Sequence, residues 1–283
     1  MAGRFSRSWS LAGASWQVLK RDTGLMVFPF VSAIAVMVVA AAFALGAFGI
    51  VGFDRLSSLD KHHVPPMYYV GAFAFYVCMY FVVFFCNAAL VGAAMMRLDG
   101  RTPSVSDGWA IARSRAGVIL GYALIAATVG MVLRAVQERL GFVGRFVVGL
   151  LGVGWTVATA MVVPVLVSHD VGPIDAVKES AGLLKKTWGE NVIGGAGIGL
   201  AFMLVYGLII AAAVALGFGA AWLGSFALVV TVAVLAIVAM ILASLAHAAL
   251  TGIYSAALYR YATTGTAGSG FDSGVLQTAF ARK

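Results

Sequence analysis

The stretch PVLVSHDVGPIDAVKESAGLLKKTW, residues 164–188, decides the fold, because a long apolar run there breaks into charge and then becomes apolar again. We call this stretch the elbow. Pro173 predicts a helix start, since proline at the first helical position gives up only an N–H that would lack a partner anyway. At 100° per residue, five apolar side chains share one narrow face with Lys178 and Lys185 along its edge: Ile174, Val177, Ala181, Leu184 and Trp188. We therefore expect a helix that lies on a membrane surface, with its lysines reaching the headgroups.

The composition of the whole chain supports a membrane protein. Of its 283 residues, 62% are hydrophobic and 11% are charged, and the mean hydropathy is +0.99. These values lie far from those of a soluble domain, so an ordinary surface helix on a soluble core is disfavoured for the elbow. We expect a single all-α, polytopic membrane domain that ends in a flexible tail at 262–283. The six expected spans are at about 24–53, 67–96, 117–136, 146–167, 191–216 and 226–259.

Two further segments resemble the elbow helix at 173–188. Residues 4–21 and 104–115 also place apolar side chains on one face, which predicts interfacial helices. The chain then reads as three repeats, each an interfacial helix followed by a two-span hairpin. Descent from one ancestral unit and shared physical constraint both account for this pattern. The residues expected to anchor these helices at the membrane surface are Trp9, Trp16, Trp109, Lys178, Lys185 and Trp188.

The basic residues predict the orientation of the chain. The formal net charge is +8, but no basic stripe with interleaved aromatics indicates nucleic acid as a partner. The cations instead lie in the short segments between the apolar runs. Fourteen Lys and Arg side chains fall on the side that holds both termini, and five fall on the other. The positive-inside rule therefore places both termini in the cytoplasm.

Glycines within the spans predict close contacts between helices. Gly195 and Gly199 lie one helical turn apart in the fifth span, where they expose backbone to a neighbouring helix. Gly46 and Gly49 make a similar surface near the far end of the first span. Whether the neighbour is a span of the same chain or of a second subunit stays open.

Few polar side chains lie deep in the spans. Asn87 and His247 stand out, and a hydrogen bond to a neighbouring helix is the default interpretation of each, with a role in a transport pathway as the alternative. The second span, 67–96, is rich in aromatic residues, which favours packing on neighbours or lipid over a ligand groove. Cys78 and Cys86 lie within this span and are expected to be packing residues, not a disulfide or metal site.

The sequence offers no convincing catalytic or metal-binding motif. Asp175 and Glu179 are a close carboxylate pair, but they lie beside lysines on the polar face of the elbow helix, which predicts solvated ion pairs. His62 and His63 lie in a polar loop at 54–66, yet adjacent histidines do not face one another on a regular element. We expect no enzyme activity, no cofactor and no metal.

The elbow and the N-terminal region also resemble a known family. This is a poorly characterised prokaryotic family of six-span proteins with a domain of unknown function, and the resemblance covers nearly the whole chain. It implies a helical protein of the prokaryotic cytoplasmic (inner) membrane with no assigned catalytic residues. A looser likeness links the elbow to the membrane domain fused to some glycerophosphodiester phosphodiesterases, whose catalytic domain this sequence lacks. The residues that carry the resemblance are 164–167, Gly172, Pro173, Ala176, Ser180, Trp188, 5–9 and 25–30.

Two functional hypotheses follow from these features. The first is a non-catalytic membrane scaffold or accessory subunit that self-associates, supported by the glycine-rich faces, the interfacial helices and the lack of charge within the spans. The alternative is a transporter or channel for a lipid or another apolar solute, supported by the six spans and the aromatic second span. Expected partners are membrane lipids and further copies of the chain or subunits of a membrane complex.

Overall fold

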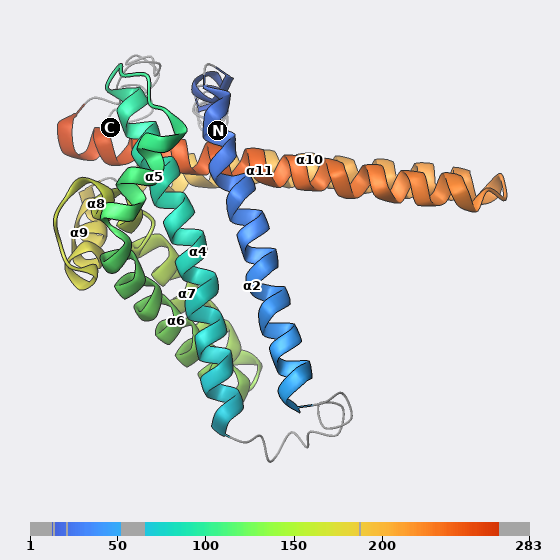
Figure 1. Ribbon diagram of the computed structural model, residues 1–283, viewed down its shortest axis with the longest axis horizontal. Coiled ribbons are helices and arrows are strands. Elements are labelled where there is room, and N and C mark those ends of the chain that lie inside the picture. Colours follow the sequence, from blue (N-terminus) through green and yellow to red (C-terminus); the bar gives the residue numbers. More distant parts are fainter. Residues whose placement is uncertain (1–12, 14, 21, 52–65, 187, 266–283) are drawn as a thin grey trace. The chain divides into compact units, whose positions relative to one another are not determined.

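The computed structural model describes residues 13, 15–20, 22–51, 66–186 and 188–265 (Figure 1). All the regular structure in these ranges is helical, which confirms the predicted all-α class. The helices are η1 Thr23–Met26, α2 Val27–Val51, α4 Pro66–Leu98, α5 Val105–Ser114, α6 Ala116–Arg139, α7 Phe142–Ala158, α8 Val162–Ser168, α9 Pro173–Lys186, α10 Trp188–Trp222 and α11 Phe226–Thr264.

Six stretches of the described chain are long and apolar enough to cross a membrane, as predicted. This identifies a multi-pass membrane protein. The interfacial helix expected at 4–21 lies mostly outside the described residues, as does the expected tail. The six candidate spans are Thr23–Ala47, Pro66–Leu98, Ala116–Arg139, Phe142–Ser168, Gly197–Trp222 and Phe226–Thr264.

The chain divides into two compact units. The first contains η1, the end of α4 from Ala94, the following loop to Thr102, and helices α10 and α11. The second contains α2, the rest of α4, and helices α5 to α9.

The fourth span is broken into two helices, α7 and α8, where the sequence predicts one continuous span at 146–167. Pro164 has no N–H, and its ring clashes with the carbonyl group four residues earlier, so a straight helix cannot pass through this point. A tight turn connects the two helices, and in it the Val162 N–H donates to the Thr159 carbonyl at 3.1 Å. The physical signal for the break is therefore Pro164 itself.

Helix α5 begins at a capping box. The Ser104 hydroxyl accepts from the backbone N–H of Asp107 at 3.2 Å, and the Asp107 carboxylate accepts from the backbone N–H of Ser104 at 2.8 Å. The Ser104 hydroxyl also donates to that carboxylate at 2.7 Å. These bonds hold the pKa of the Asp107 carboxyl below its ordinary value. Helix α5 thus has a well-defined start within the segment expected to be interfacial.

Helices α10 and α11 are the longest elements of the first unit. They contain 35 and 39 residues, so each is roughly 50–60 Å long, more than the ~30 Å of a bilayer core. The two helices pack side by side (Figure 1, orange). In the turn between them Gly224 has a φ of 65°, a left-handed conformation that suits glycine. The next residue, Ser225, caps α11 by accepting from the Leu228 N–H at 3.4 Å.

Candidate packing and polar sites of the apolar helices

Ser180 connects the elbow helix α9 to the break between α7 and α8. Its side chain is 1% exposed. The Ser180 hydroxyl donates to the Ala158 carbonyl at 2.7 Å and accepts from the Met161 N–H at 3.1 Å. Both backbone groups lie at the break, where the helical bonding pattern is interrupted and such groups need side-chain partners. One hydroxyl therefore joins the elbow helix to the broken span.

The buried face of α9 overlaps only in part with the apolar stripe that the sequence predicts, of which Leu184 is buried. Ala176, Ser180 and Leu183 lie at positions i, i+4 and i+7 and are all buried, and α9 packs there on α6, α7 and α8. Ile174, which the sequence places on the membrane-facing stripe, is 60% exposed. The small size of Ala176 and Ser180 is the sequence signal for this face, because it lets neighbouring helices approach closely.

Ion pairs cover the polar side of the elbow. Lys178 Nζ lies 3.0 Å from Asp175 Oδ1, and His169 Nδ1 lies 2.9 Å from Glu179 Oε1. Asp175 and Lys178 are both well exposed, so their pair contributes little to stability. The close carboxylate pair of the sequence, Asp175 and Glu179, thus has Lys178 and His169 as its respective partners.

The predicted anchoring residues have different environments. Lys178 and Lys185 are exposed. Trp16 is 43% exposed, and the Lys20 ammonium lies 5.5 Å from the centre of its ring. Trp109 is half-buried, and its ring packs on Phe28 and Phe85 with centroids 5.2 and 5.9 Å apart. Trp9 and the side chain of Trp188 lie outside the described residues.

The closest helix contact at a glycine lies at Gly108, which the sequence analysis does not single out. A Cβ at this position would lie 2.5 Å from Cζ of Phe28 and 2.7 Å from the carbonyl oxygen of Ala89. Gly92 and Gly121 are similar, since a Cβ there would lie 2.9 Å from side-chain carbons of Ile111 and Pro173 respectively. The second unit therefore uses these three glycines for close packing.

The glycines that the sequence emphasises have open space around them. A Cβ at Gly46, Gly49 or Gly199 would meet no atom of the described chain within 4 Å. Gly195 lies among residues whose side-chain surroundings are not described. The packing expected at Gly199 therefore has no partner within the first unit and stays a prediction.

His247 of α11 contacts α10. Its ring stacks on Phe202 with centroids 4.5 Å apart and 10° between the ring planes. Its Nδ1 lies 3.3 Å from the Tyr206 hydroxyl, a hydrogen bond whose direction depends on the imidazole tautomer. His247 is half-buried between the helices. A polar contact between neighbouring apolar helices, the default interpretation of His247, is present.

Residues 66–271, well over half of the chain, match the family described as Family of unknown function (DUF6159). The chain belongs to this family. No curated protein and no solved structure matches the chain. The DUF6159 region includes every helix from α4 to α11, and so it contains the elbow, Ser180, Gly108 and His247.

Aromatic rings within the DUF6159 region pack on one another. In α4, the rings of Tyr80 and Phe84 stack with centroids 5.6 Å apart, and Phe84 contacts Tyr122 of α6 at 4.6 Å. Further along α4, Phe85 reaches Trp109 of α5. The aromatic character of the second span thus serves contacts between helices of the second unit.

The other predicted polar residues of the DUF6159 region do not form a common site. Asn87 is half-buried, and the structure gives it no hydrogen bond within the described chain. Cys86 is buried and Cys78 half-buried, and both are free thiols. Within the described ranges, no three His, Cys, Asp or Glu side chains lie close enough to hold a metal ion. The loop with His62 and His63 lies outside those ranges.

Substitutions of His247 should separate a structural role from a transport role. In lipid nanodiscs, His247→Leu is expected to lower the melting temperature more than His247→Asn, because an amide can keep the hydrogen bond to Tyr206. Such a bond in a membrane contributes roughly 0.6–2 kcal/mol. In a Tyr206→Phe background, where this bond is already lost, His247→Leu should cost less than in the wild type. Unchanged melting temperatures together with altered solute flux in liposomes would contradict the structural role.

Proposed function

We propose that this protein is a non-catalytic membrane scaffold or accessory subunit that self-associates through α10 and α11. One observation supports this best. Within the first unit, α10 and α11 pack on each other, and residues 226–244 of α11 include no buried residue. In the most apolar window of the candidate span Gly197–Trp222, 6% of residues are buried, and in that of Phe226–Thr264 none is. Helices of this length need neighbours, either lipid or protein.

A second copy of the chain is the occupant that the exposed surface of this hairpin favours. Gly199, Gly207 and Gly217 of α10 all have open space where a side chain would be. Small residues let the backbones of two membrane helices approach closely, and van der Waals contact between helices then drives association in lipid. His247 and Tyr206 add a half-buried polar pair at mid-length, with hydrogen-bonding capacity that lipid chains cannot satisfy.

The ion pairs of the elbow support a non-catalytic role. Asp175 is paired with Lys178 and Glu179 with His169, and all four side chains are at least partly exposed. A catalytic acid–base pair usually lies in a pocket, whereas these carboxylates lie on an exposed helix face beside their partners. We infer that these carboxylates have a structural role on the polar side of the elbow.

We also infer that the protein lies in a prokaryotic cytoplasmic membrane with both termini in the cytoplasm. The excess of Lys and Arg on one side of the six spans supports this orientation. The looser likeness of the elbow to the membrane domain fused to some glycerophosphodiester phosphodiesterases supports a membrane-embedding role for this fold.

Native mass spectrometry in lipid nanodiscs tests self-association. We expect the wild-type protein to form oligomers and Gly199→Leu to form smaller assemblies, because the added side chain holds the second copy away. The melting temperature of Gly199→Leu should stay within about 2 °C of the wild type, since the added atoms have space within the chain.

The matched control is Gly149→Leu in α7, which places the same side chain in equally open space on another span. This variant should keep the wild-type number of subunits. A monomeric wild-type protein would overturn the proposal. Lipid flux across liposomes from such a monomer would favour the transporter instead.

A further inference from the structure

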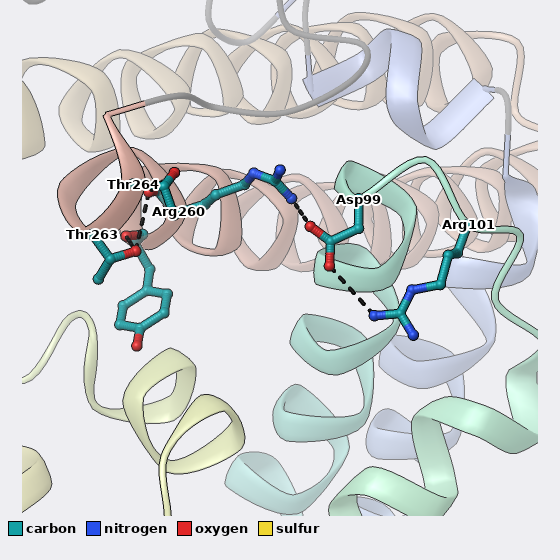
Figure 2. Close-up of polar contacts among 6 residues, drawn as sticks. Asp99, Arg101, Arg260, Thr263 and Thr264 are labelled. Atoms are coloured by element: carbon teal, nitrogen blue, oxygen red, sulfur yellow. Dashed lines mark hydrogen bonds and ion pairs between the residues drawn. The ribbon is translucent and has the colours of Figure 1, made fainter.

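Two arginines and one aspartate meet in the first unit (Figure 2). Arg260, in the last turns of α11, forms an ion pair through Nη1 with Oδ1 of Asp99. Arg101 approaches the other oxygen of the same carboxylate, with Nη2 3.4 Å from Oδ2. We call Asp99, Arg101 and Arg260 the arginine cluster.

The end of α4 fixes one half of the arginine cluster. Gly100 has a φ of 83°, a left-handed conformation that suits glycine. Its N–H donates to the Arg97 carbonyl at 3.0 Å, and the Arg101 N–H donates to the Met96 carbonyl at 3.1 Å. This pair of bonds is the Schellman arrangement that ends many helices. It sets Asp99 and Arg101 on either side of one tight turn.

The end of α11 leaves the Arg260 guanidinium available for contacts away from its own helix. The Thr264 hydroxyl donates to the Arg260 carbonyl at 2.8 Å, and the Thr263 hydroxyl donates to the Tyr259 carbonyl at 3.0 Å. The Gly265 N–H donates to the Tyr261 carbonyl at 2.9 Å. These last carbonyls therefore have partners without the guanidinium, which extends towards Asp99 (Figure 2).

The arginine cluster has more positive charge and more donors than its carboxylate can satisfy. Two guanidinium groups share one carboxylate, so the cluster has a formal charge of +1. Nε of Arg260 is buried and has no hydrogen-bond partner within the described chain. A buried charged donor without an acceptor is unfavourable, and an incoming anion would remove that penalty.

The free donors of Arg260 suit one class of ligand. In an arginine side chain, the Nε–H and one terminal amino group form a fork that two oxygens of one anion can bridge. The Asp99 carboxylate occupies Nη1, on the other side of the guanidinium. Arg101 is 64% exposed and Arg260 25% exposed, so an anion can approach both side chains, and it reaches the buried Nε of Arg260 when this side chain shifts. Phosphate has the oxygen spacing and charge for such a fork.

The arginine cluster lies at the ends of two candidate spans. Arg260 lies near the end of the candidate span Phe226–Thr264, and Asp99 directly follows the candidate span Pro66–Leu98. Basic side chains at the ends of membrane helices lie at the level of lipid phosphates. We propose that Arg260 and Arg101 bind one phosphate group here, supplied by an anionic lipid headgroup or by free phosphate. This site does not depend on self-association.

Native mass spectrometry of the full-length protein tests this site with two probes. In nanodiscs of phosphatidylcholine with phosphatidylglycerol, the wild type should retain phosphatidylglycerol after release from the disc. Arg260→Gln and Arg101→Gln should each lower this retention roughly tenfold, the effect of losing a charge-assisted hydrogen bond. Arg260→Lys should give an intermediate loss, because it keeps the charge and removes the fork. Inorganic phosphate, added to discs of phosphatidylcholine alone, is the second probe.

Arg134→Gln is the matched control, because Arg134 is also an arginine at the end of a span but pairs with Glu138 at 3.0 Å. It should leave lipid retention unchanged. Protection of the wild type from heat by inorganic phosphate, with no lipid preference, would identify free phosphate as the source. Equal retention in the wild type and Arg101→Gln, with no protection by phosphate, would overturn the site. Arg101→Gln decides this even if Arg260→Gln fails to fold, because Arg101 is mostly exposed.

Discussion

Replacing Gly108 with alanine is expected to lower the melting temperature of the protein by about 3–10 °C, equivalent to roughly 1–3 kcal/mol of overpacking. The new Cβ would lie 2.7 Å from the backbone oxygen of Ala89, which cannot move without shifting α4. It would also lie 2.5 Å from the ring of Phe28, which is 1% exposed and has no room to turn away. In a helix interior, glycine to alanine otherwise stabilises by about 1 kcal/mol. A loss of stability would therefore run against helix propensity.

Gly182→Ala is the matched control for this prediction. Gly182 lies inside α9, and a Cβ there would meet nothing within 4 Å of the described chain. This variant should keep or slightly raise the melting temperature, because only the gain in helix propensity remains. If Gly108→Ala has the same melting temperature relative to the wild type as Gly182→Ala, the close approach of α5 to α4 does not limit the stability of the protein.

Replacing Ser180 with alanine is expected to destabilise the protein by about 2–4 kcal/mol, because it removes two buried hydrogen bonds at once. The Met161 N–H and the Ala158 carbonyl would both lose their side-chain partner. With Ser180 only 1% exposed, bulk water is poorly placed to replace the hydroxyl. Thermal unfolding in nanodiscs measures the loss, and protease cleavage near the break at 159–161 should become faster.

Ser114→Ala provides the comparison. The Ser114 hydroxyl donates to the Ile111 carbonyl at 2.7 Å, but it is exposed, so water can replace it. This change should alter stability by less than about 0.5 kcal/mol. Ser180→Cys should fall between the wild type and Ser180→Ala, since a thiol is a weaker donor of similar size. Equal stability of Ser180→Ala and Ser114→Ala would show that the elbow does not depend on the bridging hydroxyl.

The sequence was a reliable guide to the helices because their signals are local. Runs of apolar residues long enough to cross a bilayer predict the six spans, and the helix start at Pro173 follows from proline chemistry alone. The polar pair on α9 was also predictable, because Asp175 and Lys178 lie one helical turn apart. The break within the fourth span also has a local signal, which is Pro164. The continuous apolar run at 146–167 nevertheless favours the prediction of one unbroken span.

The candidate sites were less predictable, because glycine spacing does not show which helix faces meet. Gly195 and Gly199 have the spacing typical of a helix contact, yet Gly199 has open space in the described chain. Gly108 stands alone in a short amphipathic helix, yet a Cβ there would lie only 2.7 Å from the backbone of α4. His247 was partly predictable. The sequence shows a polar residue within an apolar run, but it does not show that Tyr206 is its hydrogen-bond partner.

By itself, the sequence determined the all-helical class, the six apolar spans and the helix start at the elbow, because periodicity and proline act over neighbouring residues. The tertiary structure alone decided which distant groups meet. In the folded chain the Ser180 hydroxyl donates to the Ala158 carbonyl, and Arg260 forms an ion pair with Asp99. Such contacts depend on which faces of two helices pack together. The packing energy that selects these faces is a sum over many residues from distant parts of the chain, so a local sequence pattern does not encode it.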